Sequence, residues 1–242
     1  MLYGIISDIH SNLEALTSVL KQLKNVDKII CLGDVVGYGP NPNECVEEIR
    51  QLKIPTIAGN HDRAVTKDLV TTWFNANAKA AVKWTQQVIT LENLEYLKNL
   101  PEVIVEDKFE IVHGSLRSPL EEYITNISEA IPTFDLMTQP LCFIGHTHRP
   151  MFIGLKNDGN FDGRTLKDNE EVFVGDYEKV IINVGSVGQP RDRDPRASYG
   201  AYNSKTKIFS LHRVAYDIVK VQKKMKAVNL PQFLIDRLAA GR

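Results

Sequence analysis

The sequence predicts an α/β protein organised around a parallel sheet. Three short apolar runs, at residues 2–6, 28–32 and 54–58, are each followed by a polar loop and then by a helical pattern. Repeated strand–loop–helix units are typical of parallel sheets whose faces are covered by helices. No internal repeat, low-complexity tract or long linker interrupts the 242 residues, so we expect a single domain over residues 1–242.

The first two units place acidic and histidine side chains in turns. The first apolar run ends in Ser7-Asp8-Ile9-His10, and Ser11-Asn12-Leu13-Glu14 then has the S-x-x-E form of a capping box. The second run ends in Gly33-Asp34. A second helix is expected shortly afterwards, with Asn41 as its cap, Pro42 in the first position and Glu44 in the third.

The middle of the chain continues the pattern. The third apolar run precedes Gly59-Asn60-His61-Asp62, and residues 71–100 are expected to be helical up to Pro101. Further strands are expected at 103–105, 109–112 and 141–144, and the last two end in His113 and in Gly145-His146-Thr147-His148. Residues 115–140 have no clear period.

After Pro150 the pattern favours antiparallel strands. Residues 152–155 and 161–165 flank a turn with Asp158-Gly159, a strong hairpin signal. Short connections separate the strands expected near 171–174, 180–184, 198–203 and 207–212. Residues 217–240 are expected to be helical, with an interruption near Pro231.

The composition excludes several classes of partner. The formal charge of −1, from 29 basic and 30 acidic residues, implies no broad nucleic-acid patch and no polybasic membrane surface. No apolar run approaches the ~20 residues that span a bilayer, and no signal peptide is evident. The three cysteines, Cys31, Cys45 and Cys142, form no CxxC pair and are expected to be buried and reduced. We therefore expect a cytoplasmic protein.

Five of the polar loops contain side chains of the same three types. Each follows an apolar strand and contains Asp, Asn or His: Asp8 and His10, Asp34, Asn60 and His61, His113, and His146 and His148. Five of the six histidines lie in these loops, and only His212 does not. Such ligand sets suit Mn²⁺, Fe or Zn²⁺, and Asp34, beside two glycines at a strand end, is placed to bridge two metal ions.

Each of these residues also has a structural explanation when it is taken alone. Asp8 could be a charge at a helix N-terminus, Asn60 could be a turn residue, and His113 could be a hydrogen-bonded histidine at a strand end. His146 and His148 are the stronger pair, because alternate residues of an extended segment point to the same side. The metal interpretation therefore depends on the whole set.

The ordered pattern D-x-H, G-D, G-N-H-D, H and G-H-x-H, from Asp8 to His148, resembles the calcineurin-like metallophosphoesterase superfamily. Residues 183–191 and 194–199 are similar to its YfcE-like branch of prokaryotic phosphodiesterases, which commonly has proline where Val184 stands. The resemblance implies a four-layer α/β/β/α sandwich of two mixed β-sheets flanked by helices, with the site at one rim.

The resemblance also implies a role for each motif residue. One metal ion would be held by Asp8, His10 and His148, a second by Asn60, His113 and His146, and Asp34 would bridge them. The ions could be Mn, Fe, Zn, Ni or Co. A metal-bridging hydroxide would hydrolyse a phosphodiester, with phosphomonoesters left open, and His61 would assist the leaving group while Asp62 steadies the His61 ring and favours its charged form.

The expected partner is a phosphate-ester substrate, either a small phosphodiester or a nucleotide, in contact with Asn60, His61, Tyr38 and Arg191. Between Arg191 and Arg196 the arginines alternate with aspartates, a pattern that usually indicates a solvated loop. Two alternatives are a Ser/Thr protein phosphatase, whose arginine after the second motif is replaced here by Gly37-Tyr38, and a non-catalytic binding scaffold, which typically lacks the Asn60-His61 pair. The sequence gives no oligomeric state.

Overall fold

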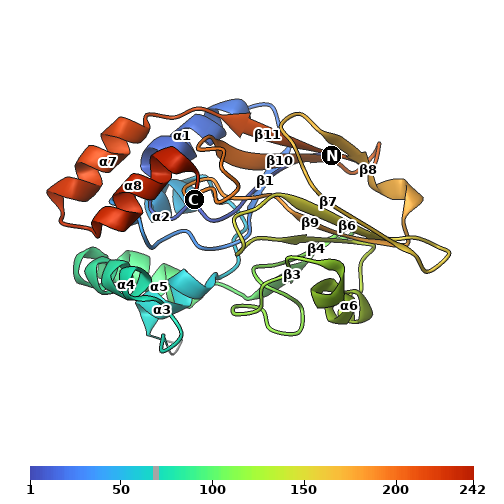
Figure 1. Cartoon of the computed structure of the whole chain (residues 1–242), viewed down its shortest axis with the longest axis horizontal. Coiled ribbons are helices and arrows are strands. Elements are labelled where there is room, and N and C mark those ends of the chain that lie inside the picture. The colour runs from blue at the N-terminus through green and yellow to red at the C-terminus, as the bar shows by residue number, and fades with distance from the viewer. Residues whose placement is uncertain (68–70) are drawn as a thin grey trace.

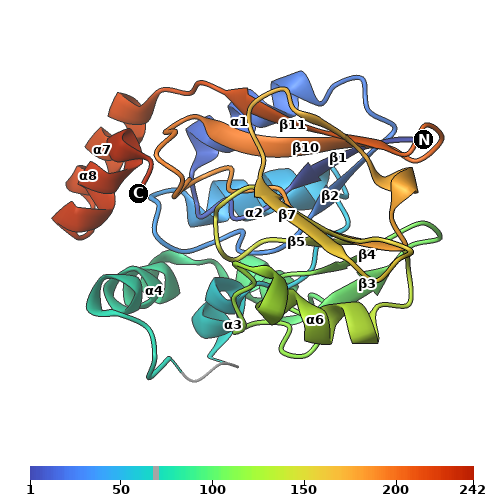
Figure 2. The same cartoon turned by 45° about the vertical axis from the view of Figure 1, so that its right-hand side comes forward.

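A computed structural model describes residues 1–67 and 71–242 of the chain. In this part the strands form two mixed β-sheets that lie face to face, and helices cover both outer surfaces (Figures 1 and 2). This arrangement confirms the predicted four-layer α/β/β/α sandwich. No helix among the described residues is long and apolar enough to cross a membrane.

The first sheet contains the N-terminal strands. Its order is β2 (Lys28–Cys31), β1 (Leu2–Ile6), β10 (Ala197–Asn203), β11 (Ile208–Val214) and β8 (Glu171–Phe173), and β8 continues into the short helix η1 (Val174–Asp176). Only β1 and β2 of these strands run parallel to each other. The strand expected at 54–58 is reduced to one bridge between Thr56 and Cys31, where Pro55 has no N–H to extend a ladder.

The second sheet contains the strands of the middle of the chain. Its order is β3 (Val103–Val105), β4 (Glu110–Val112), β5 (Leu141–Ile144), β9 (Lys179–Asn183), β6 (Met151–Leu155) and β7 (Phe161–Thr165). Strands β4, β5 and β9 are parallel. The predicted hairpin is confirmed, because β6 pairs with β7 in antiparallel register with Leu155 opposite Phe161.

Side chains of the first sheet alternate between two of the three hydrophobic cores found among the described residues. Ile5 and Ile30 face the second sheet and meet Phe143 in a core between the sheets. Ile6 and Cys31, one residue along, face the helices of the first outer layer, which are α1 (Leu13–Gln22), α2 (Pro42–Gln51), α7 (Ile218–Ala227) and α8 (Gln232–Ala240). Helix α6 (Ile127–Leu136) covers the second sheet (Figure 2). The three cysteines are buried and free, as expected.

The predicted helix at 71–100 is wrong in its extent, because this segment contains two helices. Helix α3 (Asn60–Thr66) precedes α4 (Ala76–Val88), which begins where the Asn75 side chain accepts a hydrogen bond from the Ala78 N–H. Helix α5 (Leu91–Lys98) has its own cap at Thr90. Trp73 and Phe74 therefore lie in the loop before α4.

The cap of α1 is Asn12 rather than the predicted Ser11. The Asn12 carboxamide oxygen accepts a hydrogen bond from the Ala15 N–H at 3.1 Å, and its amide nitrogen donates to the Gly188 carbonyl at 2.9 Å. The Ser11 hydroxyl is buried without a hydrogen-bond partner. The cap is thus displaced by one residue, and because Ala15 rather than Glu14 takes the third helical position, the predicted capping box does not form.

Replacing Asn12 with alanine tests this assignment. Asn12→Ala is expected to lower the free energy of unfolding by about 1–2 kcal/mol, because it removes both the cap and the bond to Gly188. Ser11→Ala is the matched control and should change it by less than about 0.5 kcal/mol. Urea denaturation gives both values, and a larger loss in Ser11→Ala than in Asn12→Ala would contradict the assignment.

Candidate metal centre

The loops that follow β1, β2, β4 and β5 meet at one rim of the sandwich. Backbone hydrogen bonds join them directly: the Asp8 N–H donates to the Gly33 carbonyl at 3.0 Å, and the His10 N–H donates to the Asp34 carbonyl at 2.9 Å. The Gly145 N–H likewise donates to the His113 carbonyl at 2.9 Å. The His146 N–H donates to Asp8 Oδ2 at 3.1 Å and so joins the two pairs of loops across 138 positions of the sequence.

The backbone at this rim is strained. Five residues with side chains at the site have φ between 48° and 66°, namely Asp8, His10, Asp34, His146 and His148. Non-glycine residues rarely adopt this left-handed region, and it costs on the order of 1 kcal/mol or more for each residue. Strain that is concentrated on polar side chains at one rim is typical of a functional site.

Two glycines allow the backbone to approach the carboxylates closely. A Cβ atom at Gly59 would lie 2.0 Å from Asp34 Oδ1, and one at Gly145 would lie 2.8 Å from Asp8 Oδ2. The space is used for hydrogen bonds, because Asp34 Oδ1 accepts from the His61 N–H at 2.8 Å and Asp8 Oδ2 accepts from the His146 N–H at 3.1 Å. One oxygen of each carboxylate is thereby fixed, and the other faces the site.

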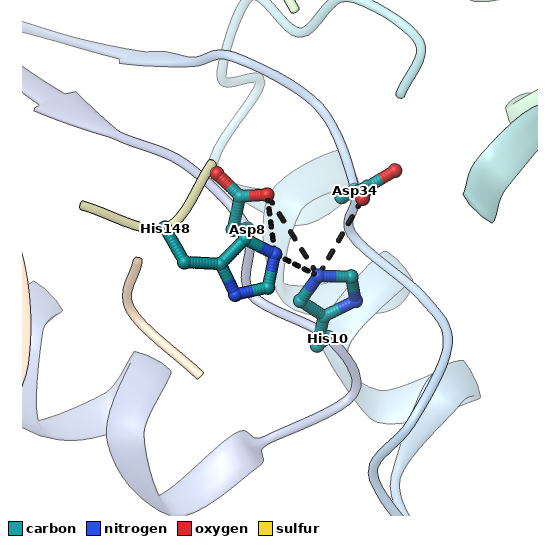
Figure 3. Close-up of side chains that lie close together, drawn as sticks. All are labelled: Asp8, His10, Asp34 and His148. Carbon is teal, nitrogen blue, oxygen red and sulfur yellow. Dashed lines mark hydrogen bonds and ion pairs between the residues drawn. The ribbon is translucent and has the colours of Figure 1, made fainter. Parts of the chain in front are cut away.

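A first group of buried side chains contains Asp8, His10, Asp34 and His148 (Figure 3). One ligand atom of each lies within 4.8 Å of the others. His148 Nε2 is 3.1 Å from Asp8 Oδ1, and His10 Nε2 is 3.5 Å from Asp34 Oδ2. The two Nε2 atoms are 3.1 Å apart.

Hydrogen bonds to the backbone show that this group fits a cation. Nδ1 of His10 lies 3.1 Å from the Val36 carbonyl, and Nδ1 of His148 lies 2.6 Å from the Gln189 carbonyl, so each Nδ1 must carry the proton. Both Nε2 atoms then point lone pairs at each other and at Asp8 Oδ1, which is buried without a hydrogen-bond partner. A cluster of acceptors without a donor is the environment of a metal ion.

A second group contains Asp34, His113 and His146, with ligand atoms again within 4.8 Å. Nδ1 of His113 donates to the Leu32 carbonyl at 2.8 Å, while its Nε2 is 3.4 Å from Asp34 Oδ2 and 3.2 Å from the side-chain oxygen of Asn60. Nε2 of His146 lies 3.3 Å from the Glu121 carbonyl, which leaves its Nδ1 as the acceptor. Asp34 therefore belongs to both groups.

His61 lies beside these groups, but Asp62 does not orient it. The two oxygens of Asp62 accept hydrogen bonds from the backbone N–H groups of Val36 (3.1 Å) and Gly59 (3.0 Å), while His61 Nδ1 is buried without a partner. Neighbouring residues of a helix do not face each other, which explains why the predicted contact is wrong. Burial lowers the pKa of His61 to about 4, so the ring is neutral rather than charged as expected.

A pocket of about 210 Å³ opens over the site. Its lining includes the expected contact residues Tyr38, Asn60, His61 and Arg191. The Arg191 side chain donates to Gln189 Oε1 at 3.2 Å and lies 3.5 Å from the Tyr38 hydroxyl. A larger groove of about 700 Å³ between α1, α2 and β2 contains none of the site residues, so it is not part of this centre.

Three aromatic residues also line this pocket, and the sequence does not single them out: Trp73, Phe74 and Tyr123. The Tyr123 ring stacks on His146 with a centroid distance of 4.0 Å and an interplanar angle of 18°. Tyr123 lies in the segment 115–140, which has no period, and Trp73 and Phe74 lie in the stretch expected to be helical. The one sequence signal that could have indicated them is that they are aromatic residues within or beside otherwise polar loops.

Comparison with known proteins identifies the family. The profile described as the calcineurin-like phosphoesterase superfamily domain matches residues 1–207. The chain belongs to the calcineurin-like phosphoesterase superfamily. This result confirms the family resemblance of the loop motifs and supports a hydrolase that uses divalent metal ions.

Individual relatives of this calcineurin-like phosphoesterase match over its full length. The uncharacterized protein MJ0912 of Methanocaldococcus jannaschii is 40% identical over 99% of this chain and 98% of its own length. The solved structure of a metallophosphoesterase from Sphaerobacter thermophilus is 42% identical, with a TM-score of 0.90 and complete coverage of both chains. The hypothetical protein PH1004 of Pyrococcus horikoshii OT3 shares the fold at 22% identity, with a TM-score of 0.82 over 100% of this chain and 98% of its own.

The protonation states of the histidines in this calcineurin-like phosphoesterase site are set by their burial and by the nearby carboxylates. Burial lowers the pKa of His146 to about 3 and also lowers the pKa values of His10 and His148. Burial opposes a charge on His113 as well, but the nearby Asp34 carboxylate outweighs it and raises the pKa of His113 to about 9. Without metal ions, a proton on His113 therefore balances part of the negative charge of Asp34.

Metal binding should displace that proton. At pH 8 His113 is protonated in the metal-free protein, whereas a metal ion needs its lone pair, so Mn²⁺ binding is expected to release about one proton per chain. Calorimetric titrations in buffers of different ionisation enthalpy measure the release. The release should disappear in His113→Asn. Equal proton release by the variant and the unmodified protein would contradict the role of His113.

Proposed function

We propose that the chain hydrolyses phosphate esters, with a preference for phosphodiesters, at a centre of two metal ions. The observation that carries the proposal is the membership of Asp34 in both ligand groups. One ion would be held by Asp8, His10, His148 and Asp34, and the other by Asn60, His113, His146 and Asp34. The donor set of carboxylate, imidazole and amide oxygen suits Mn, Fe, Zn, Ni or Co.

The chemistry of the proposal combines the ions with neighbouring side chains. When bound, the ions would lower the pKa of a water nucleophile and offset the charge that develops on the phosphoryl group. His61, neutral and beside Asp34, would donate a hydrogen bond from its ring N–H to the leaving oxygen and stabilise the negative charge that develops there. The guanidinium of Arg191, whose Nε has no hydrogen-bond partner, would bind a phosphoryl oxygen near Tyr38.

One further observation supports the proposal. The relative from Sphaerobacter thermophilus at 42% identity is named a metallophosphoesterase.

The three buried free cysteines fit a reducing compartment, and we propose a cytoplasmic location on that basis.

Paired variants separate metal binding from turnover. Asp34→Ala is expected to lose both ions, because each would lose a carboxylate ligand at once. His61→Ala should keep both ions while turnover falls at least about 100-fold, the usual contribution of one hydrogen-bond donor to developing charge. Metal content by mass spectrometry after gel filtration, together with turnover, tests the pair. Retention of two ions by Asp34→Ala would refute the shared ligand.

A substrate panel tests the reaction itself. Metal-stripped protein is restored with each ion in turn and assayed with bis-p-nitrophenyl phosphate and with p-nitrophenyl phosphate. We expect turnover only after restoration, with the higher kcat/KM for the diester. A higher kcat/KM for the monoester would overturn the diester preference, and no turnover with any ion and ester would favour the scaffold alternative.

The same panel tests Arg191. Arg191→Ala is expected to lower kcat/KM for both esters by at least about tenfold, as the loss of a charge-assisted hydrogen bond of about 1.5 kcal/mol or more implies. Arg164→Ala is the control, because Arg164 is an exposed residue of β7 that pairs with Glu170 at 2.9 Å. An unchanged kcat/KM in Arg191→Ala would remove Arg191 from the substrate site.

A further inference from the structure

The pocket beside the metal residues has an aromatic wall that binding of phosphate alone does not require. A row of rings leads away from the site: His61 lies 4.9 Å from Phe74, and Phe74 lies 4.5 Å from Trp73, measured between centroids. Tyr123 contributes a further ring from another segment, stacked on His146. All of these residues line the same pocket.

Two of these rings are unusually exposed. Trp73 is 42% exposed and Tyr123 is 43% exposed, although burial of a large aromatic side chain is worth about 1.5–3 kcal/mol. Their segments are held together, because the Trp73 indole N–H donates to Glu121 Oε1 at 3.1 Å. Partly exposed aromatic rings that are held in place beside a functional site are suited to stacking with a ligand.

The other end of the pocket provides polar atoms. His61 Nδ1 and Arg191 Nε are buried without hydrogen-bond partners. The volume of about 210 Å³ is below the range of about 300–1,000 Å³ that encloses drug-sized ligands, so there is room for little more than a phosphoryl group and one flat ring.

We infer that this pocket selects phosphate esters that carry a planar aromatic or heteroaromatic ring close to the phosphoryl group, and that the ring stacks on Trp73. The inference rests on the proposed function, because the metal ions and Arg191 would hold the phosphoryl group. Trp73 and Tyr123 would then determine specificity without taking part in bond cleavage.

Binding of non-hydrolysable phosphonates to the Mn²⁺-restored protein tests the inference. The probes are benzylphosphonate, cyclohexylmethylphosphonate and methylphosphonate, which share one anionic group and differ in the ring. Dissociation constants come from calorimetry with the unmodified protein, Trp73→Ala and Trp73→Phe. Phe233→Ala is the control, since Phe233 is an exposed aromatic residue on α8 outside the pocket.

Benzylphosphonate is expected to bind at least about twofold more tightly than the saturated cyclohexylmethyl compound. Trp73→Ala should weaken benzylphosphonate at least about fivefold and methylphosphonate by less than about twofold. Trp73→Phe should restore most of the selectivity for the ring, and Phe233→Ala should leave it unchanged.

Two outcomes would overturn the inference. The first is equal binding of the benzyl and cyclohexylmethyl compounds by the unmodified protein, and the second is an equal loss for all three probes in Trp73→Ala. Turnover of bis-p-nitrophenyl phosphate is measured in the same samples, so that the two proposals fail separately. Turnover without ring selectivity refutes only this inference, whereas ring selectivity without turnover refutes the proposed hydrolysis.

Discussion

The carboxylate of Asp34 is buried, and two separate groups of side chains share it. Its Oδ1 atom is fixed by the His61 N–H, while its Oδ2 atom faces Nε2 of both His10 and His113. A buried carboxylate is expensive unless positive charge or donors compensate it. Nδ1 of each histidine donates to a backbone carbonyl, so Nε2 of His10 offers a lone pair, and Nε2 of His113 offers one once a metal ion displaces its proton. Cations are therefore the natural compensation for this carboxylate.

The fold accounts for how such a cluster can exist. Parallel strands place their following loops at one rim, and backbone hydrogen bonds between the Asp8 and Asp34 loops fix the loops to each other. The left-handed φ angles of the site residues are an energetic cost of this arrangement. Gly59 and Gly145 avoid a further cost, because they have no Cβ atom to clash with the carboxylates. The hydrophobic cores on both faces of each sheet hold the strands in register, so the strain cannot relax.

Much of this could be predicted from the sequence because the signals are local. Apolar runs located most strands, the Asp158-Gly159 turn located a hairpin, and histidines concentrated after strands indicated the residues of the candidate metal centre. What could not be predicted depends on neighbours distant in sequence. The cap is Asn12 because the Asn12 side chain also donates a hydrogen bond to the Gly188 carbonyl. Asp62 does not contact the His61 ring because its carboxylate accepts hydrogen bonds from the backbone N–H groups of Val36 and Gly59. The places of Trp73 and Tyr123 likewise depend on how two loops meet.

The most direct test of a centre shared through Asp34 is anomalous diffraction from crystals of the protein grown with Mn²⁺. The account predicts two peaks, one on either side of the Asp34 carboxylate, with Asp8, His10 and His148 around one and with Asn60, His113 and His146 around the other. A single peak, or two peaks of which neither is coordinated by Asp34, would contradict it.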